Sequence, residues 1–132
     1  MKLSVVNWLR AAILVLLIGV LALGAYLKNV SDYKKKVEMT TIREINLSDI
    51  PDGTYEGEYD VDFVYAKVSV TVQNGEIKNI AILEHKNGHG QPAEVVTDRI
   101  VEEQRIDVDT VSGATNSSIV LKKAVENALD QA

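Results

Sequence analysis

The sequence predicts an α+β protein in which a small antiparallel sheet packs against helices, preceded by one N-terminal transmembrane helix. Three features of the 132 residues predict this fold: a long charge-free apolar run near the N-terminus, an Asn-Gly pair between two strand-like segments, and an amphipathic helical pattern near the C-terminus. We expect a membrane anchor at residues 1–27, a basic juxtamembrane neck at 28–50 and a folded domain at 51–132.

The composition excludes several classes of function. The chain has no cysteine, so disulfides, thiolate metal sites, cysteine nucleophiles and a lipid-anchored cysteine are excluded. The net charge of −5 conceals an asymmetry, because six Lys/Arg stand against Asp32 alone up to Lys36, whereas the rest of the chain carries eight Lys/Arg and eighteen Asp/Glu. An acidic domain beside a basic neck argues against nucleic acid as a partner.

The apolar run extends from Ala11 to Leu27, and its roughly 17 residues are near the lower limit for a helix that spans a bilayer. Trp8 suits the depth of the headgroups, and the long side chain of Arg10 can reach them. The run is either a retained anchor or a cleaved signal peptide. We favour the retained anchor, because the run is long for a signal peptide and the cleavage pattern is imperfect.

Basic residues flank the apolar run on both sides. Lys2 and Arg10 precede it, while Lys28 and Lys34 to Lys36 follow it. Counted by the positive-inside rule, these charges slightly favour a cytoplasmic domain, although a lysine cluster also suits the anionic headgroups of a membrane surface. The neck ends at Pro51-Asp52-Gly53, a turn signal that marks the expected start of the domain.

The first part of the domain has the pattern of an antiparallel meander. Residues 54–59 are expected to form a short strand, in which Gly57 marks a bulge or a close backbone approach. Residues 61–73 alternate between apolar and polar side chains, and residues 77–84 return as the partner strand. Asn74-Gly75 between them is the strongest short-range hairpin signal in the chain. The sheet should therefore have one buried face.

A glycine-containing loop follows over residues 85–94 and ends where a short helix is expected. His85 and His89 lie in it, but no third ligand occurs at a helpful spacing, so no metal site is expected. Gly88 and Gly90 have no side chains to block the close approach of a flat ring.

The most informative stretch is Asp109-x-x-Ser112-Gly113-Ala114-Thr115, which leads into the pattern of a helix with one buried face. Gly113 permits a backbone conformation that other residues resist. The hydroxyl and amide side chains from Thr115 to Ser118 offer caps for the first N–H groups of the helix. Two interpretations stay open on physical grounds: a capped helix, which is the commoner case, and a phosphate seat at the positive end of the helix.

This stretch resembles the flavinylation motif Asp-x-x-Ser/Thr-Gly-Ala-Thr of the FMN-binding domain family. That family includes the flavin-bearing C subunit of the sodium-pumping NADH:quinone oxidoreductase and the G subunit of Rnf-type electron-transport complexes. In the family, a separate flavin transferase links the FMN phosphate to the hydroxyl of the last threonine. The resemblance therefore implies covalent FMN on Thr115, with Asp109, Ser112, Gly113 and Ala114 at the other constrained positions.

The rest of the domain is similar to the same family. Its opening pattern Asp-Gly-Thr-Tyr-x-Gly, a Lys-Val-x-Val strand, an Asx-Gly hairpin and a returning Ile-rich strand are all present. Residues 88–94 resemble the family's Gly-x-Gly-x-x-Ala-Glu stretch, which lines the flavin region. This implies that Gly88 and Gly90 lie near the cofactor, with His85 and Lys86 as neighbours of its ring.

The resemblance implies a membrane-tethered flavoprotein that carries covalent FMN as an electron-transfer relay. Its partners would be the membrane, a flavin transferase and membrane or extracellular redox proteins. Because the family's flavin domains characteristically lie outside the cytoplasm, we expect a single-pass protein of the cell membrane with its domain on the extracytoplasmic side. The main alternative is a non-redox binding module or complex subunit that binds FMN weakly or not at all. A stand-alone enzyme ranks last, since neither paired carboxylates nor a nucleophile with its base can be assigned.

Overall fold

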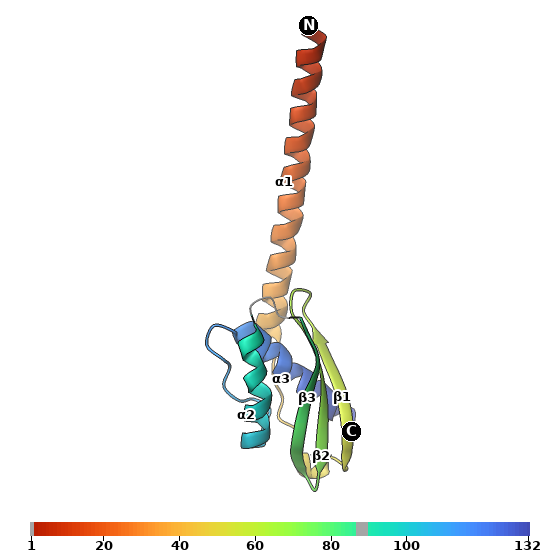
Figure 1. Ribbon diagram of the computed structural model, residues 1–132, viewed down its shortest axis with the longest axis vertical. Coiled ribbons are helices and arrows are strands. Elements are labelled where there is room, and N and C mark those ends of the chain that lie inside the picture. Colours follow the sequence, from red (N-terminus) through yellow and green to blue (C-terminus); the bar gives the residue numbers. More distant parts are fainter. Residues whose placement is uncertain (1, 87–89) are drawn as a thin grey trace. The chain divides into compact units, whose positions relative to one another are not determined.

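The computed structural model describes residues 2–86 and 90–132. Their contacts divide the chain into two compact units, Met1–Lys35 and Lys36–Ala132. The elements, labelled in Figure 1, are α1 (Lys2–Met39), the short 3-10 helix η1 (Leu47–Asp49), β1 (Gly53–Asp60), β2 (Tyr65–Gln73), β3 (Glu76–Lys86), the 3-10 helix η2 (Gln91–Glu94), α2 (Val95–Glu103) and α3 (Thr115–Asp130). The antiparallel sheet and its helices confirm the α+β class that the sequence predicts.

Helix α1 is long and apolar enough to cross a membrane. Its segment Ser4–Met39 contains an 18-residue stretch with a mean hydropathy of 2.3, none of which is buried. The whole helix has 38 residues, which corresponds to about 57 Å of length, whereas the hydrocarbon core of a bilayer is about 30 Å thick. A signal sequence near an N-terminus has the same properties, so length and composition alone fit both an anchor and a signal sequence.

The sheet has the strand order β1-β2-β3, and both pairs are antiparallel. Alternate residues of β2 are fully buried on one face, while those between them are half-buried on the other: the buried set is Ala66, Val68, Val70 and Val72. At the β2–β3 turn, Asn74 and Gly75 have φ angles of 54° and 73°. Two successive left-handed residues are what a type I′ hairpin requires, so the expected hairpin is confirmed.

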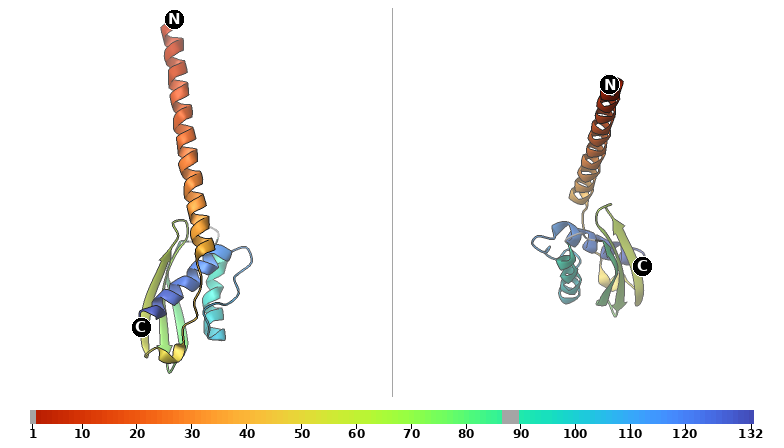
Figure 2. Two further views of the ribbon diagram at one scale, coloured as in Figure 1. Left: turned by 180° about the vertical axis from the view of Figure 1, so that it is seen from behind. Right: turned by 45° about the horizontal axis from the view of Figure 1, so that its top comes forward.

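Helix α3 covers the apolar face of the sheet, as the two opposite views in Figures 1 and 2 show, and it packs mainly on β1 and β2. Gly57 in β1 allows this contact. A Cβ at Gly57 would lie 2.2 Å from the backbone nitrogen of Ala128 and 2.3 Å from the carbonyl oxygen of Ala124. The close backbone approach that the sequence indicates at Gly57 is therefore confirmed.

Residues 36–50, which the sequence analysis assigns to the neck, belong to the same compact unit as residues 51–132. The N–H of Arg43 donates to the buried carboxylate of Glu126 in α3 at 2.7 Å. This bond fastens the neck to the helix that carries the end of the motif.

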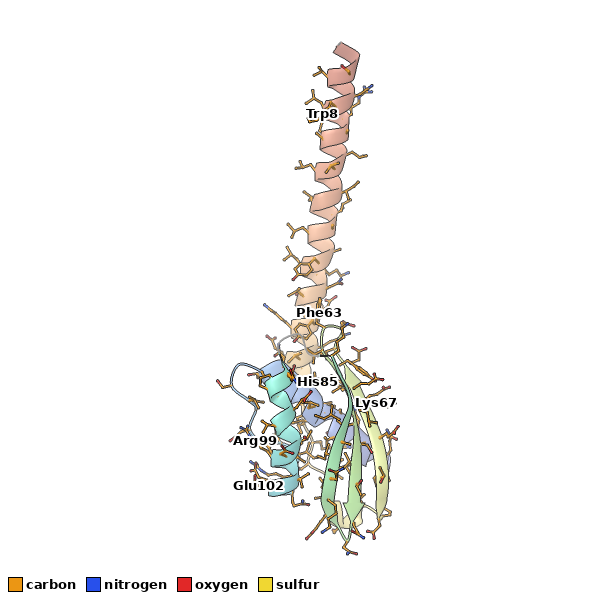
Figure 3. All side chains as sticks on the ribbon, viewed as in Figure 1. Trp8, Phe63, Lys67, His85, Arg99 and Glu102 are labelled. Carbon is orange, nitrogen blue, oxygen red and sulfur yellow. The ribbon has the colours of Figure 1, made fainter. Side chains whose placement is uncertain are left out.

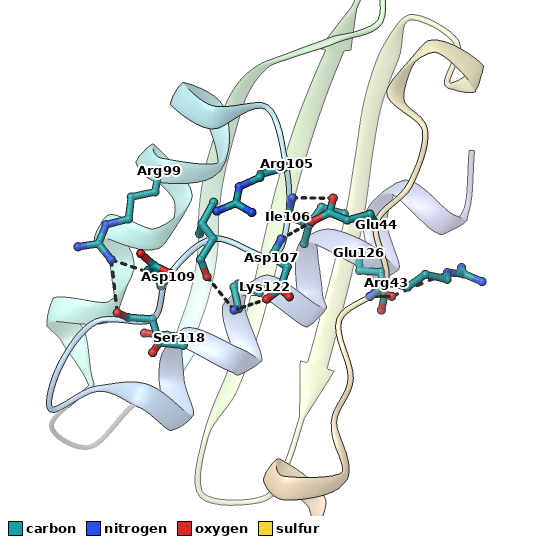
Figure 4. Close-up of polar contacts among 12 residues, drawn as sticks. Arg43, Glu44, Arg99, Arg105, Ile106, Asp107, Asp109, Ser118, Lys122 and Glu126 are labelled. Atoms are coloured by element: carbon teal, nitrogen blue, oxygen red, sulfur yellow. Dashed lines mark hydrogen bonds and ion pairs between the residues drawn. The ribbon is translucent and has the colours of Figure 1, made fainter.

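A second attachment of the neck comes from Glu44. Its carboxylate accepts the N–H of Ile106 at 3.1 Å and the N–H of Asp107 at 2.7 Å (Figure 4). Residues 106 and 107 lie outside any strand, so their backbone donors take a side chain as partner. The neck thus supports the segment that leads into the motif.

Candidate functional site

The motif residues form a tight turn at the entry to α3. The N–H of Ala114 donates to the carbonyl oxygen of Val111 at 2.9 Å, which closes a four-residue turn. Gly113, the third residue of that turn, has a φ of 81°. A positive φ at this position is the mark of a type II turn, and glycine adopts it without strain. A Cβ at Gly113 would meet no described atom within 4 Å, so the space beside this glycine is open.

Thr115 is the first residue of α3, and its side chain is exposed. Ser112 is exposed too, whereas Ala114 is only 7% exposed and anchors the turn against the core. Ser117 and Ser118, the next hydroxyls along the helix, are 3% and 0% exposed. Of these hydroxyls, those of Thr115 and Ser112 therefore face solvent.

Ser118 holds the turn from inside. Its Oγ accepts the N–H of Val111 at 3.0 Å and donates to the carbonyl oxygen of Ala114 at 2.7 Å. The sequence suggests this hydroxyl as a helix cap. In the structure it bridges the two ends of the turn instead, because a serine one turn into a helix can also reach the carbonyl four residues before it.

Lys122 of α3 binds the segment before the turn. This lysine is 4% exposed, and its Nζ lies 2.8 Å from Oδ1 of Asp107 and 2.9 Å from the carbonyl oxygen of Val108 (Figure 4). A buried ammonium is costly unless it is paired and hydrogen-bonded, and here it has both kinds of partner.

Arg99 of α2 binds the next two residues of the same segment. Its Nη1 donates to the carbonyl oxygen of Asp109 at 3.0 Å and to that of Thr110 at 3.5 Å (Figure 4). The backbone of Asp109, the first motif residue, is therefore held by a helix that lies outside the motif.

The second group of candidate residues lies at the end of β3. The side chain of His85 is 2% exposed, and its Nδ1 lies 3.1 Å from Oε1 of Glu94 in η2 (the side chain is labelled in Figure 3). Lys86 is exposed and Gly90 is buried. Gly88, together with His89, lies outside the described residues.

A shallow pocket of about 430 Å³ opens beside His85 and Lys86, and its other lining residues are Asp60, Asp62, Tyr65 and Glu84. The hydroxyl of Tyr65 donates to Oε2 of Glu58 at 2.6 Å. This hydrogen bond is the main reason why the pKa of Tyr65 is raised from 10.0 to about 12, with partial desolvation and the nearby carboxylates adding to it.

The structure therefore brings the predicted site residues together in two groups. Asp109, Ser112, Gly113, Ala114 and Thr115 form the turn group, while His85 and Lys86 line the pocket. The link between the groups is η2, which carries the partner of His85 and packs against α3. Within the described residues, no group of three His, Cys, Asp or Glu side chains is arranged to hold a metal ion.

The FMN-binding domain family model matches residues 65–130. The chain belongs to this family. The matched region runs from the start of β2 to the end of α3, so it contains the turn group, His85 and Lys86. Searches of curated proteins and of solved structures gave no match.

Sequence reasoning missed the side chains that hold the motif segment. Lys122 directly follows Leu121 in a helical pattern and looks like an ordinary solvated lysine; it is buried because residues 107 and 108 fold over it. Arg99 lies on the predicted short helix with no sign of a distant partner. The one signal that could have indicated Lys122 is its place next to an apolar position of the last helix.

Proposed function

We propose that this protein is a membrane-tethered flavoprotein that carries FMN through a phosphoester on Thr115 and relays electrons between redox partners. The observation that carries the proposal is the exposed Thr115 directly after a glycine turn, in a chain that belongs to the FMN-binding domain family. The nearer resemblance to the flavin-bearing C and G subunits of membrane electron-transport complexes supports the same function.

The residues of the turn fit a phosphate group. The open space at Gly113 leaves the backbone approachable, and Thr115 lies at the positive end of the dipole of α3, which favours an anion. The family resemblance implies that His85 and Lys86 are neighbours of the flavin ring. When bound, FMN supplies one- and two-electron redox chemistry, and the protein contributes attachment, orientation and tuning of the potential.

Attachment requires an activated donor, since a phosphate monoester does not condense readily with an alcohol in water. In the proposed step, Oγ of Thr115 attacks the flavin-side phosphorus of a flavin dinucleotide. The new Oγ–P bond replaces the bond to the leaving AMP, and the hydroxyl proton passes to a base of the transferase. No electron is transferred, and the protein gains the mass of FMN minus one water.

The helix α1 provides the proposed tether, and the domain is proposed to lie outside the cytoplasm with membrane or extracellular redox partners. Covalent attachment suits that location, because a cofactor that dissociated there would be lost to the cell. A tether also keeps the flavin within reach of partners in the same membrane, which raises its effective concentration.

The test is co-expression of the full chain with a flavin transferase, followed by intact-mass measurement and peptide mapping. We expect the added mass on Thr115 and a yellow colour that persists through denaturation and gel filtration. Thr115→Ala should give a folded, colourless protein, while Ser117→Ala, the matched loss of a neighbouring hydroxyl, should keep full loading. Flavin on Ser112 or Ser117 would overturn the assignment, and an unmodified wild type would favour the non-redox binding module.

A further inference from the structure

We propose that Arg99 and Lys122 are positioning residues that hold residues 107–110 in the conformation in which a flavin transferase modifies Thr115. This inference rests on the proposed function. Neither residue belongs to the motif, and both come from helices that flank the segment (Figure 4).

The backbone of the segment supplies the first argument. Residues 107–110 belong to no strand or helix, so their carbonyl groups have no regular partners. Three successive carbonyls nevertheless accept from a cation: that of Val108 from Lys122 at 2.9 Å, and those of Asp109 and Thr110 from Arg99 at 3.0 and 3.5 Å. The side chains of Arg99 and Lys122 thus donate to the backbone carbonyls of this segment, as the N–H groups of a neighbouring strand do in a sheet.

The burial of Lys122 supplies the second argument. Lys122 is only 4% exposed, and burial of an ammonium group is costly unless it is paired and hydrogen-bonded. Moving Asp107 and Val108 away would leave that cation without these two partners inside the protein. The segment is therefore tied to α3 more firmly than its lack of regular structure suggests.

The segment ends at the turn that presents Thr115. Val111, the residue after Thr110, is bound through its N–H to Ser118 and through its carbonyl to Ala114. The position from which the Thr115 hydroxyl attacks the phosphorus of the flavin dinucleotide thus depends on where residues 107–110 are held. Transfer of a phosphoryl-type group depends mostly on such positioning and on charge, since the protein does little covalent chemistry of its own.

The expected effect on the modification reaction follows from a population shift. If the segment is released, only a fraction of the molecules present Thr115 correctly, and the apparent affinity of the transferase for its protein substrate falls by that fraction. Loss of one charge-assisted hydrogen-bond set should raise the KM for the carrier about tenfold, with kcat little changed.

The experiment uses the full chain in detergent, a purified flavin transferase and a flavin dinucleotide, with the rate of modification measured against carrier concentration. Arg99→Met and Lys122→Met remove the donors and keep the apolar stems. Arg105→Met is the matched control, because Arg105 pairs with Glu103 on the surface. Arg99→Lys keeps a cation and should bring the KM back toward the wild-type value.

Hydrogen exchange of the unmodified proteins provides a readout that does not involve flavin. The amides of Val108, Val111 and Ala114 are hydrogen-bonded within the segment and turn, and their exchange should accelerate in Arg99→Met but not in Arg105→Met. Thermal melts identify a variant that has merely lost stability. If Lys122→Met fails to fold, the Arg99 variants decide the matter.

The outcomes separate the two proposals. A modified wild type with a raised KM in Arg99→Met, together with faster exchange of the segment, supports the positioning role. If the wild type is modified but Arg99→Met has the same KM and the same hydrogen exchange as Arg105→Met, the positioning role is overturned and the proposed function stays intact. An unmodified wild type overturns both.

Discussion

At the scale of single residues, Gly113 has a requirement that concerns the backbone and not the space around it. Its φ of 81° lies in the left-handed region, while a Cβ there would meet no described atom within 4 Å. A side chain at Gly113 would therefore strain the turn and project into the open space that the proposed phosphate needs, without disturbing the core.

Gly113→Val should abolish flavin loading while the circular dichroism spectrum stays near that of the wild type. The expected loss of stability is about 1 kcal/mol or more, from the left-handed conformation alone. Gly75→Val is the matched control, because Gly75 has a φ of 73° in the β2–β3 hairpin and its Cβ would make only ordinary contact with Ser48. It should be destabilised to a similar degree and still be fully loaded. Normal loading of Gly113→Val would show that the turn tolerates a side chain.

Tyr65 should titrate at about 12, well above its usual pKa of 10.0, because its hydroxyl donates to the carboxylate of Glu58. A raised pKa in the folded state means that the contribution of Tyr65 to stability is complete below about pH 10 and is lost as the pH rises through about 12. The absorbance of tyrosinate during an alkaline titration measures this directly. Tyr65→Phe should remove the late step, and Glu58→Gln should move it to lower pH.

The control for Tyr65 is Glu56→Gln, which removes a carboxylate from the same strand whose partner is Lys67. The late tyrosinate step should keep its position in this variant. A step that moves equally in Glu56→Gln and Glu58→Gln would mean that general negative charge, and not the hydrogen bond, raises the pKa.

At the scale of elements, the contact between β1 and α3 depends on Gly57. Gly57→Ala should destabilise the domain by about 3 kcal/mol or more, because its Cβ would lie 2.2 Å from a backbone atom of α3, so that the strand or the helix would have to move. Urea denaturation measures the change. Gly53→Ala is the control in the same strand, since its Cβ would lie 3.3 Å from the hydroxyl end of the Tyr55 side chain and not against the backbone of α3. Equal stability of the two variants would show that α3 shifts to accommodate the methyl group.

Elements encoded by local signals were predictable from the sequence. The hairpin needs only Asn74-Gly75 and the alternation on either side, and α3 needs only its own apolar period. Contacts between distant segments were not, because no local pattern marks them. Glu44 and Asp107 are 63 positions apart, and nothing near either residue indicates that one binds the backbone of the other. No local pattern near Arg99 indicates its contacts with the carbonyl oxygens of residues 109 and 110 either.

The candidate site divides in the same way. The turn was predictable because a position of positive φ favours glycine, which the sequence shows at Gly113, and because the helix that follows has a recognisable apolar period. The conformation of residues 107–110 was not, since it depends on side chains from outside the segment: Glu44, Arg99 and Lys122. The pocket beside His85 was not predictable either, because its lining comes from the ends of three strands and the loop between them.

At the scale of the whole molecule, the two compact units differ in chemistry. Met1–Lys35 contains the apolar part of α1, the helix that is long enough to cross a membrane, and Lys36–Ala132 contains the acidic flavin-family domain. If α1 is retained, the domain lies wholly on one side of the bilayer, and which side decides which redox partners it can meet.

The charges and the family point to opposite sides. Lys28 and Lys34 to Lys36 favour a cytoplasmic domain, but the bias is small because Lys2, Arg10 and the amino terminus nearly offset them. Lysines after an anchor also hold a neck against anionic headgroups, so they have a function that is independent of orientation. We therefore predict that the N-terminus is inside and residues 51–132 are outside. Protease added to intact cells or protoplasts should then remove a C-terminal tag. A tag that survives until the membrane is permeabilised would place the domain in the cytoplasm, and the extracellular electron relay would be excluded with it.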